Sequence, residues 1–305
     1  DTIGRVLSLI KPEKLQTALF EWINQLRSQY ADQDGPVLVQ IDGKTVRGSY
    51  TSSEKSDALH IVSVWASQHG LTLDQVAVDS KSNEITAIPE LLGMMDLEGT
   101  IVTIDAMGCQ KSIAKKIIDE NGDFTFAVKD NHPKLCEAIE EIFEAAYENG
   151  MIETGMRSKK TSKKQAGRRE ERYYAIGPIP EQLQALTDEW AGAKSIGQAI
   201  TISTKDGKES SEVRYYISSR AAKAGEFSDS IRSHWSIESM HWVLDVVFHE
   251  DASRILIGNA TENMSFVRRF VTTLLKQDTT KVSLKQKRKR AGWYTDFLEK
   301  LLLGA

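Results

Sequence analysis

Residues 37–44 read Val-Leu-Val-Gln-Ile-Asp-Gly-Lys, a short apolar run followed by an acidic residue. Gly35-Pro36 precedes this run and Gly43 closes it, so we expect a buried strand bounded by turns. A second run of the same kind, Thr-Ile-Val-Thr-Ile-Asp, occupies residues 100–105. The two runs predict two buried strands that each end in an aspartate, Asp42 and Asp105.

The segments around these runs predict the order β-β-β-α-β-α-β. Residues 59–66 (LHIVSVWA) and 71–78 (LTLDQVAV) indicate two further strands joined by a tight turn at Gly70. The remaining elements of this part are expected as helices at 84–95 and 110–120 and as strands at 100–104 and 123–128. Three antiparallel strands followed by crossovers are the pattern of a ribonuclease H-like mixed sheet, an α/β fold.

The chain divides into four predicted regions. Residues 1–34 form a helical N-terminal region, and 35–150 form the first part of the ribonuclease H-like core. Residues 151–222 carry strand-like segments at 171–176, 198–203 and 212–218, which predicts a β-rich insertion. Residues 223–305 return to helical periodicity and form the last part of the core with a basic tail.

Composition excludes several classes of protein. The 305 residues carry a net charge of −4, with 40% hydrophobic and 27% charged residues, which is typical of a globular protein and not of a disordered one. Two cysteines exclude a disulfide scaffold. No apolar run reaches the ~20 residues of a membrane span. Without a secretory signal before Ile3, we expect the reducing cytoplasm.

The two aspartates are the first candidates for chemistry. The first and fourth strands of a ribonuclease H-like sheet are neighbours, so Asp42 and Asp105 are expected to face each other. Two buried carboxylates are costly unless a cation neutralises them, and their hard oxygen atoms suit Mg²⁺ or Mn²⁺. The alternative is that each aspartate is a turn residue or a helix cap.

A third acidic residue is expected from a helix around 232–245. His234, Glu238, His241 and Asp245 lie there at a spacing that forms one stripe. A buried hydrogen-bonded network or a solvated helix face would give the same pattern. A zinc site is less favoured, because the stripe has no cysteine and no His-Glu-x-x-His motif.

Long strings in the sequence resemble a known family. They are IDGKTVRGS (41–49), ALHIVS (58–63), KSNEITAIPELL (81–92), TIDAMGCQ (103–110) and HWSIESMHWVLDVVFHEDASR (234–254). These strings resemble the ISAs1 family of bacterial insertion-sequence transposases, which includes the H-repeat-associated proteins. The resemblance covers nearly the whole chain.

This resemblance implies a DDE transposase with a ribonuclease H-like core. The catalytic, metal-binding residues would be Asp42 in IDGK, Asp105 in TIDAMG and Glu238 in HWSIE. Two Mg²⁺ ions are the implied cofactors. Arg232 and His234 would replace the basic residues that precede the glutamate in the related insertion-sequence-4 group, with His241 in support. The family also implies that residues 1–34 end a DNA-binding-associated region.

Basic residues predict where DNA binds, despite the negative net charge. Residues 157–172 hold eight Lys and Arg, and 285–290 hold five in six positions. The candidates in these runs are Lys159, Lys160, Lys163, Lys164, Arg168, Arg169, Lys287, Arg288, Lys289 and Arg290. Lys44, Arg47 and Lys129 are further candidates near the aspartates. The alternative is a flexible, solvated loop and tail. Lys81, Asn83 and Glu84 either position DNA or cap a helix.

The leading interpretation is a DDE transposase that cuts and joins double-stranded DNA at insertion-sequence ends. From the family we expect a homodimer when two ends are paired, and a bacterial cytoplasmic, nucleoid-associated location without a membrane. Two other functions remain open. One is a catalytically silent descendant that only binds DNA, and the other is a ribonuclease H-like nuclease without strand transfer.

Overall fold

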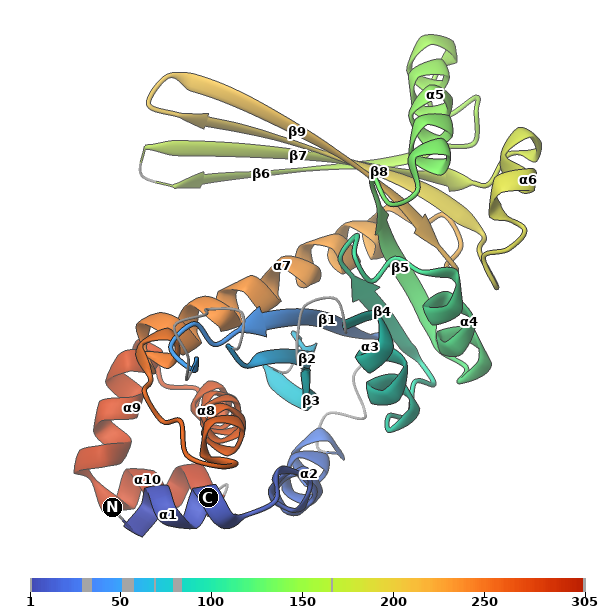
Figure 1. Cartoon of the computed structure of the whole chain (residues 1–305). Coiled ribbons are helices and arrows are strands. Elements are labelled where there is room, and N and C mark those ends of the chain that lie inside the picture. The colour runs from blue at the N-terminus through green and yellow to red at the C-terminus, as the bar shows by residue number, and fades with distance from the viewer. Residues whose placement is uncertain are drawn as a thin grey trace. The chain divides into compact units, whose positions relative to one another are not determined.

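The computed structural model describes residues 2–28, 35–50, 58–68, 70–78, 84–165 and 167–303. The chain forms two compact units, both drawn in Figure 1. Unit 1 is Asp1–Leu91 with Trp235–Ala305, and unit 2 is Leu92–His234. The chain passes between them twice, after Leu91 and within helix α7 (Ala224–Val246).

Unit 1 contains an antiparallel meander of three strands, β1 (Val37–Thr45), β2 (His60–Ala66) and β3 (Leu71–Val78). β1 pairs with β2, and β2 pairs with β3. Every residue of β2 is buried. A fully buried central strand explains why its sequence reads as a continuous run instead of alternating.

Unit 1 also contains several helices. They are α1 (Thr2–Leu9), α2 (Pro12–Ser28), α3 (Glu84–Gly93), α8 (Ala260–Gln277), α9 (Leu284–Trp293) and α10 (Thr295–Leu303), with a short 3₁₀ helix η4 (Glu250–Ala252). α8 is the most buried of them. The Thr72 N–H of β3 donates a hydrogen bond to Thr273 Oγ1 of α8 at 3.1 Å, and the Trp22 ring of α2 lies 5.2 Å from that of Phe270. α8 therefore links the sheet to the N-terminal helices.

Unit 2 contains six strands in one sheet. They are β4 (Thr100–Ile104), β5 (Asp123–Val128), β6 (Arg157–Gln165), β7 (Arg168–Pro178), β8 (Ser195–Lys205) and β9 (Lys208–Ser218). β4 and β5 are parallel, and β5 pairs antiparallel with β9. β9, β8, β7 and β6 then follow as antiparallel neighbours. The β-rich segment thus continues the sheet that β4 and β5 begin.

The helices of unit 2 connect and cover these strands. They are α4 (Lys111–Asp119), α5 (Pro133–Asn149), η3 (Glu181–Leu183), α6 (Gln184–Thr187) and the first part of α7. α4 buries Ile113, Ala114 and Ile117, the apolar stripe seen in the sequence. In the part of the chain that the structure describes, no helix is both long and apolar enough to cross a membrane.

The order of elements confirms the predicted ribonuclease H-like α/β fold, with β1-β2-β3-α3-β4-α4-β5 along the chain. One alternative was wrong: the basic run at 157–172 is not a flexible loop, because it forms β6 and the start of β7. The basic run at 285–290 is likewise not a flexible tail and lies in α9. Residues 29–34, at the end of the first predicted region, lie outside the described residues.

Aromatic side chains fasten the first part of α7 to the sheet of unit 2. Phe227 packs against Tyr174 of β7 and Tyr216 of β9, with ring centroids 6.3 and 5.4 Å apart. Gly197 of β8 lies directly beneath the Phe227 ring, and a Cβ atom on Gly197 would meet that ring at 2.5 Å. The close approach of helix and strand therefore requires glycine at this position.

Replacing this glycine is expected to weaken unit 2. Gly197→Ala forces Phe227 off its position and should lower the free energy of unfolding by about 1–3 kcal/mol, measured by urea denaturation. Gly225→Ala in α7 is the matched control, because a Cβ there meets nothing within 4 Å. Alanine should stabilise that helix by up to about 1 kcal/mol. Equal effects of the two variants would contradict the packing argument.

Candidate functional site

Asp42 lies within β1 of unit 1, where it pairs with Ser63 of β2. The sequence predicted a strand that ends in Asp42, and the structure confirms Asp42 on that strand but extends β1 through Lys44 to Thr45. Its Oδ1 accepts a hydrogen bond from the Gly43 N–H at 2.9 Å. The side chain is 25% exposed. The strand thus holds Asp42 in a partly buried position with access to solvent.

His241 of α7 is the neighbour of Asp42. Its Nδ1 lies 3.6 Å from Asp42 Oδ2. Burial, together with the nearby charges of Arg269 and Lys44, lowers the pKa of His241 to about 3. The imidazole is therefore neutral at neutral pH and adds no positive charge beside Asp42.

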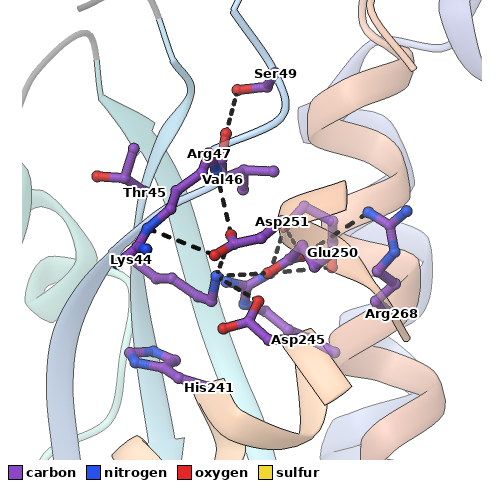
Figure 2. Close-up of polar contacts among 12 residues, drawn as sticks. Lys44, Thr45, Val46, Arg47, Ser49, His241, Asp245, Glu250, Asp251 and Arg268 are labelled. Atoms are coloured by element: carbon purple, nitrogen blue, oxygen red, sulfur yellow. Dashed lines mark hydrogen bonds and ion pairs between the residues drawn. The ribbon is translucent and has the colours of Figure 1, made fainter. Parts of the chain in front are cut away.

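Lys44 forms the centre of an ion-pair cluster, shown in Figure 2. Its Nζ lies 2.8 Å from Asp245 Oδ1 of α7 and 2.8 Å from Asp251 Oδ1 of η4. Glu250 Oε2 lies 3.7 Å away. Burial alone would raise the pKa of Asp251, but the hydrogen bonds and positive charges of Lys44 and Arg47 together outweigh it and hold that pKa below its usual value.

Lys44 was predicted to contact DNA, and the structure gives it another environment. The side chain is only 8% exposed, and its ammonium group is engaged by carboxylates. Arg47, by contrast, is 83% exposed and lies 3.6 Å from Asp251 Oδ2 through its Nε. Arg47 is therefore accessible to a phosphate, whereas Lys44 is a structural cation.

A fully buried ion pair continues the cluster into α8. Glu250 and Arg269 are both inaccessible to solvent, and Arg269 Nη1 donates to Glu250 Oε1 at 3.0 Å. Ser265 Oγ donates to the same carboxylate oxygen at 2.8 Å. Arg269 Nε in turn donates to Ser63 Oγ of β2 at 3.1 Å. These contacts connect η4, α8 and the strand that pairs with β1.

Glu238 lies on the exposed side of α7. The opposite side of the helix is apolar: Ile237, Met240 and Leu244 are buried and cluster with Trp65 of β2. Glu238, His241 and Asp245 recur at spacings that place them on one stripe. The helix thus buries one face and leaves Glu238 accessible.

Asp105 of unit 2 follows β4 directly and organises the next turn. Its Oδ1 accepts hydrogen bonds from the N–H groups of Met107 and Gly108 at 3.0 and 3.2 Å. The side chain of Asn131 holds the same loop by donating to Ala106 O at 2.6 Å. Asp105 is therefore a turn residue, as one alternative held, and that role leaves its use in catalysis open.

A cavity of about 90 Å³ lies beside Asp105. Its lining combines cationic, apolar and imidazole groups, among them Lys129, Arg214 and His234. His234 Nδ1 lies 3.2 Å from Thr103 Oγ1. Burial lowers the pKa of His234 to about 4, although the negative charge of Asp105 acts in the opposite direction. This ring is also neutral at neutral pH.

No ready-made cluster of metal ligands exists within the described residues. Across the ranges that the structure describes, no group of three or more His, Cys, Asp or Glu side chains could hold a metal ion. The predicted metal-binding carboxylates instead lie on three different elements: Asp42 in β1, Asp105 in the turn after β4 and Glu238 on α7. Their joint action stays a prediction.

The basic candidates fall into different environments. Lys129 and Arg232 are exposed, as are Lys163 and Lys164 in β6. Lys159 lies 3.4 Å from Asp229 of α7. Three other candidates form ion pairs with the carboxylates Glu170 and Glu171 of β7, namely Lys160, Arg168 and Arg169.

The residues of α9 that were predicted to contact DNA are only partly exposed. Lys287 is buried and donates to Leu275 O at 3.3 Å, so its side chain is not accessible from the solvent as a DNA contact would require. The guanidinium of Arg288 lies over the Phe248 ring and donates to Val247 O. Lys289 and Arg290 lie over the rings of Trp293 and Phe297. These aromatic and backbone contacts bind the basic run to unit 1.

Sequence reasoning missed several residues. Glu250 and Asp251 were not among the predicted site residues, but Asp251 binds Lys44 and Glu250 binds Arg269. Glu84 is buried against His60, while Lys81 and Asn83 lie outside the described residues. Asn131 carried a signal that could have been used, since it lies two residues before Pro133, the first residue of α5. Arg214 had none, because its place at the cavity depends on strand pairing.

The cysteines carry no sign of reactivity. Cys109 is buried, and its burial together with Asp105 raises the pKa of the thiol well above its usual value. Cys136 is half-buried, and its pKa is also raised by burial. Since the thiolate is the reactive form, neither cysteine is a candidate nucleophile.

Comparison with known proteins identifies a family. Residues 33–274 match the family described as "Transposase DDE domain". The chain is 40% identical over its whole length to a putative protein, YbfL, of Escherichia coli K12, covering 80% of that protein. It is 39% identical over the same extent to the H repeat-associated putative transposase YhhI of the same strain.

A solved structure is also similar, at a lower level. A piggyBac transposase in a synaptic complex with hairpin DNA matches with a TM-score of 0.41 and 11% sequence identity. That match covers 88% of this chain and 54% of the other.

Removing the Lys44 ammonium should destabilise unit 1. In Lys44→Gln, Asp245 and Asp251 lose a shared cation, and the free energy of unfolding should fall by about 1–3 kcal/mol at pH 7. The deficit should shrink below about pH 4, where carboxylates become protonated. Arg47→Gln is the control and should change stability by less than about 0.5 kcal/mol. Urea denaturation measures both, and a pH-independent loss would contradict the charge argument.

The buried histidine His234 should make stability depend on pH. Its pKa of about 4 in the fold is below the ordinary value of 6.5, so the unfolded chain takes up the proton first. The free energy of unfolding therefore falls as pH drops from 6.5 to 4, by about 3 kcal/mol from this residue. His234→Gln should remove that share of the slope. His249→Gln, at an exposed histidine, should retain the wild-type slope.

Proposed function

Because the chain belongs to the DDE transposase family, we propose that it cleaves and joins DNA at the ends of its own insertion sequence. The observation that carries this proposal is the family match over residues 33–274, which includes both aspartates and Glu238. Asp42 lies in β1 and Asp105 directly follows β4, two strands of the predicted fold.

The proposed catalytic residues are Asp42, Asp105 and Glu238. Carboxylate oxygens are the donors that Mg²⁺ and Mn²⁺ prefer, so the donor set fits these ions. Two observations support this fit: Asp42 is partly exposed, and Asp105 lines a cavity. Bound divalent ions would lower the pKa of an attacking water and stabilise a leaving oxygen.

The two histidines support this role by their charge state. Burial keeps His241, beside Asp42, and His234, beside the Asp105 cavity, neutral at neutral pH. A protonated imidazole would compete with a cation for these carboxylates. A neutral imidazole does not compete in this way and can still donate a hydrogen bond to a phosphate oxygen.

The proposed reaction has two steps, hydrolysis at the DNA end and transfer of that end to the target. Water attacks the scissile phosphorus, the bond to the 3′ oxygen breaks, and the DNA end is left with a 3′-hydroxyl. That hydroxyl then attacks a phosphodiester of the target, and the target's own 3′ oxygen leaves. No covalent bond between protein and DNA is formed in either step.

The proposed partners are double-stranded DNA and a second copy of the chain. Exposed Lys129, Arg232 and Arg47 are available to contact phosphates. Pairing two transposon ends would bring two copies together, so we propose a homodimer on DNA. The proposed location is the bacterial cytoplasm, at the nucleoid.

The first test is nicking of supercoiled plasmid in Mn²⁺. The wild type should nick, whereas Asp42→Asn, Asp105→Asn and Glu238→Gln should be reduced to background with unchanged folding by circular dichroism. Glu137→Gln, an exposed acid on α5, is the control and should nick like the wild type. Metal-dependent nicking by Asp105→Asn would refute its assignment.

The same assay separates the two other functions. A wild type that binds DNA but never nicks it would be a silent, transposase-derived DNA-binding protein. Nicking without transfer of a 3′-hydroxyl end into a target plasmid would indicate a nuclease. Joined products that require Asp42 and Asp105 would support the transposase.

A further inference from the structure

Four strands of unit 2 extend beyond the helices that cover their base. We define the arm as residues 159–165 and 168–174 of β6 and β7 with 199–205 and 208–214 of β8 and β9. At its base, Phe227 of α7 packs on one face through Tyr174 and Tyr216. The other face meets α5, whose Tyr147 donates to Gln198 Oε1 at 2.6 Å. Figure 1 shows the two hairpins continuing past α5.

Strand register assigns every residue of the arm to one of these two faces. Residues directly opposite each other in antiparallel strands share a face, and the faces alternate along each strand. Lys159, Tyr174, Ala199 and Arg214 are one such row. Since Tyr174 contacts Phe227 of α7, we call this side the α7-side face. The opposite side is the α5-side face.

The two faces differ in charge. The described α7-side face carries seven basic side chains against two carboxylates, and the α5-side face carries three against two. The basic residues of the α7-side face are Lys159, Lys163, Arg168, Arg172, Lys205, Lys208 and Arg214. The α5-side face instead places apolar Ile200, Ile202 and Val213 among its polar residues.

The carboxylates of the α7-side face do not cancel its charge. Glu170 is shared by Arg168 and Arg172, and Glu212 lies 2.7 Å from Arg214. Lys163, Lys205 and Lys208 are exposed beyond these pairs. The outer rows of this face thus present a field of positive charge to the solvent.

The α7-side face leads to the Asp105 cavity. Arg214, in the innermost basic row, lines that cavity together with Lys129 and Asp105. From Lys208 at the tip to Arg214 the strand spans about 20 Å, at about 3.3 Å per residue. That length matches about six base pairs of duplex DNA.

We propose that the α7-side face of the arm binds the phosphate backbone of duplex DNA and leads it to the cavity beside Asp105, while the α5-side face makes no DNA contact. This inference rests on the proposed function, which makes DNA the partner. It assigns roles to Arg172, Lys205, Lys208 and Arg214. It also removes Lys160, Lys164 and Arg169 from the expected DNA contacts, since they lie on the α5-side face.

The salt dependence of binding tests the inference with matched variants of the full chain. One triple variant, K163Q/K205Q/K208Q, removes three charges from the α7-side face, and the other, K160Q/K164Q/R169Q, removes three from the α5-side face. Each phosphate contact contributes about 0.9 to the slope of log K against log salt. With a 30-base-pair duplex as probe, the first variant should lose roughly 2–3 units of slope and the second less than about 1.

The outcomes separate this inference from the proposed function. Equal losses of slope in both variants would overturn the assignment of the face and leave DNA binding intact. A wild type that binds the duplex without salt dependence, or not at all, would overturn both proposals.

A second test avoids any change of charge. Ser210 and Ser211 are adjacent in β9, and the register places Ser210 on the α7-side face and Ser211 on the α5-side face. An iron chelate attached at Ser210→Cys should cleave the bound duplex at least several-fold more than one attached at Ser211→Cys. The chain labelled without either substitution corrects for Cys109 and Cys136. Equal cleavage from the two positions would overturn the inference.

Discussion

The buried ammonium of Lys44 is the interaction on which the arrangement of unit 1 depends. It follows Asp42 by two residues in β1, and it is engaged by Asp245 of α7 and Asp251 of η4 at 2.8 Å each. Glu250, beside Asp251, passes the connection to Arg269 and so to Ser63 of β2. Ion pairs thus hold together β1, α7 and η4, which are distant in sequence. Burying the Lys44 ammonium is costly unless carboxylates pair with it.

This cluster has a consequence for the strand that carries Asp42. Asp42 and Lys44 are neighbours on the same face of β1, but their environments differ. The Asp42 carboxylate is partly exposed, whereas the Lys44 ammonium is buried in ion pairs. The ammonium of Lys44 is engaged by Asp245 and Asp251. Burial keeps the imidazole of His241, the neighbour of Asp42, neutral at neutral pH. The strand thus carries two charged residues whose surroundings are set by different distant segments.

The sequence predicted the buried strands well, because continuous apolar runs such as 37–41 and 100–104 have few other uses in a globular chain. It missed β6, since a strand exposed on both faces shows no hydrophobic pattern to detect. It also misjudged Lys44, whose partners Asp245 and Asp251 lie about 200 residues away. Local pattern identifies elements and candidate carboxylates, while the state of each charged group depends on contacts between distant segments.

The charge of the arm also could not be predicted from the local sequence. Residues 168–172 read Arg-Arg-Glu-Glu-Arg, so their positive and negative charges nearly cancel when they are only counted. In the paired strands these residues alternate between the two faces of the sheet. Arg168 lies on the same face as Lys205 and Lys208, which are opposite it on the neighbouring strands. A chain with a net charge of −4 can thus present a strongly basic surface, because a phosphate backbone responds to the local field within about 10 Å and not to the total charge of the protein.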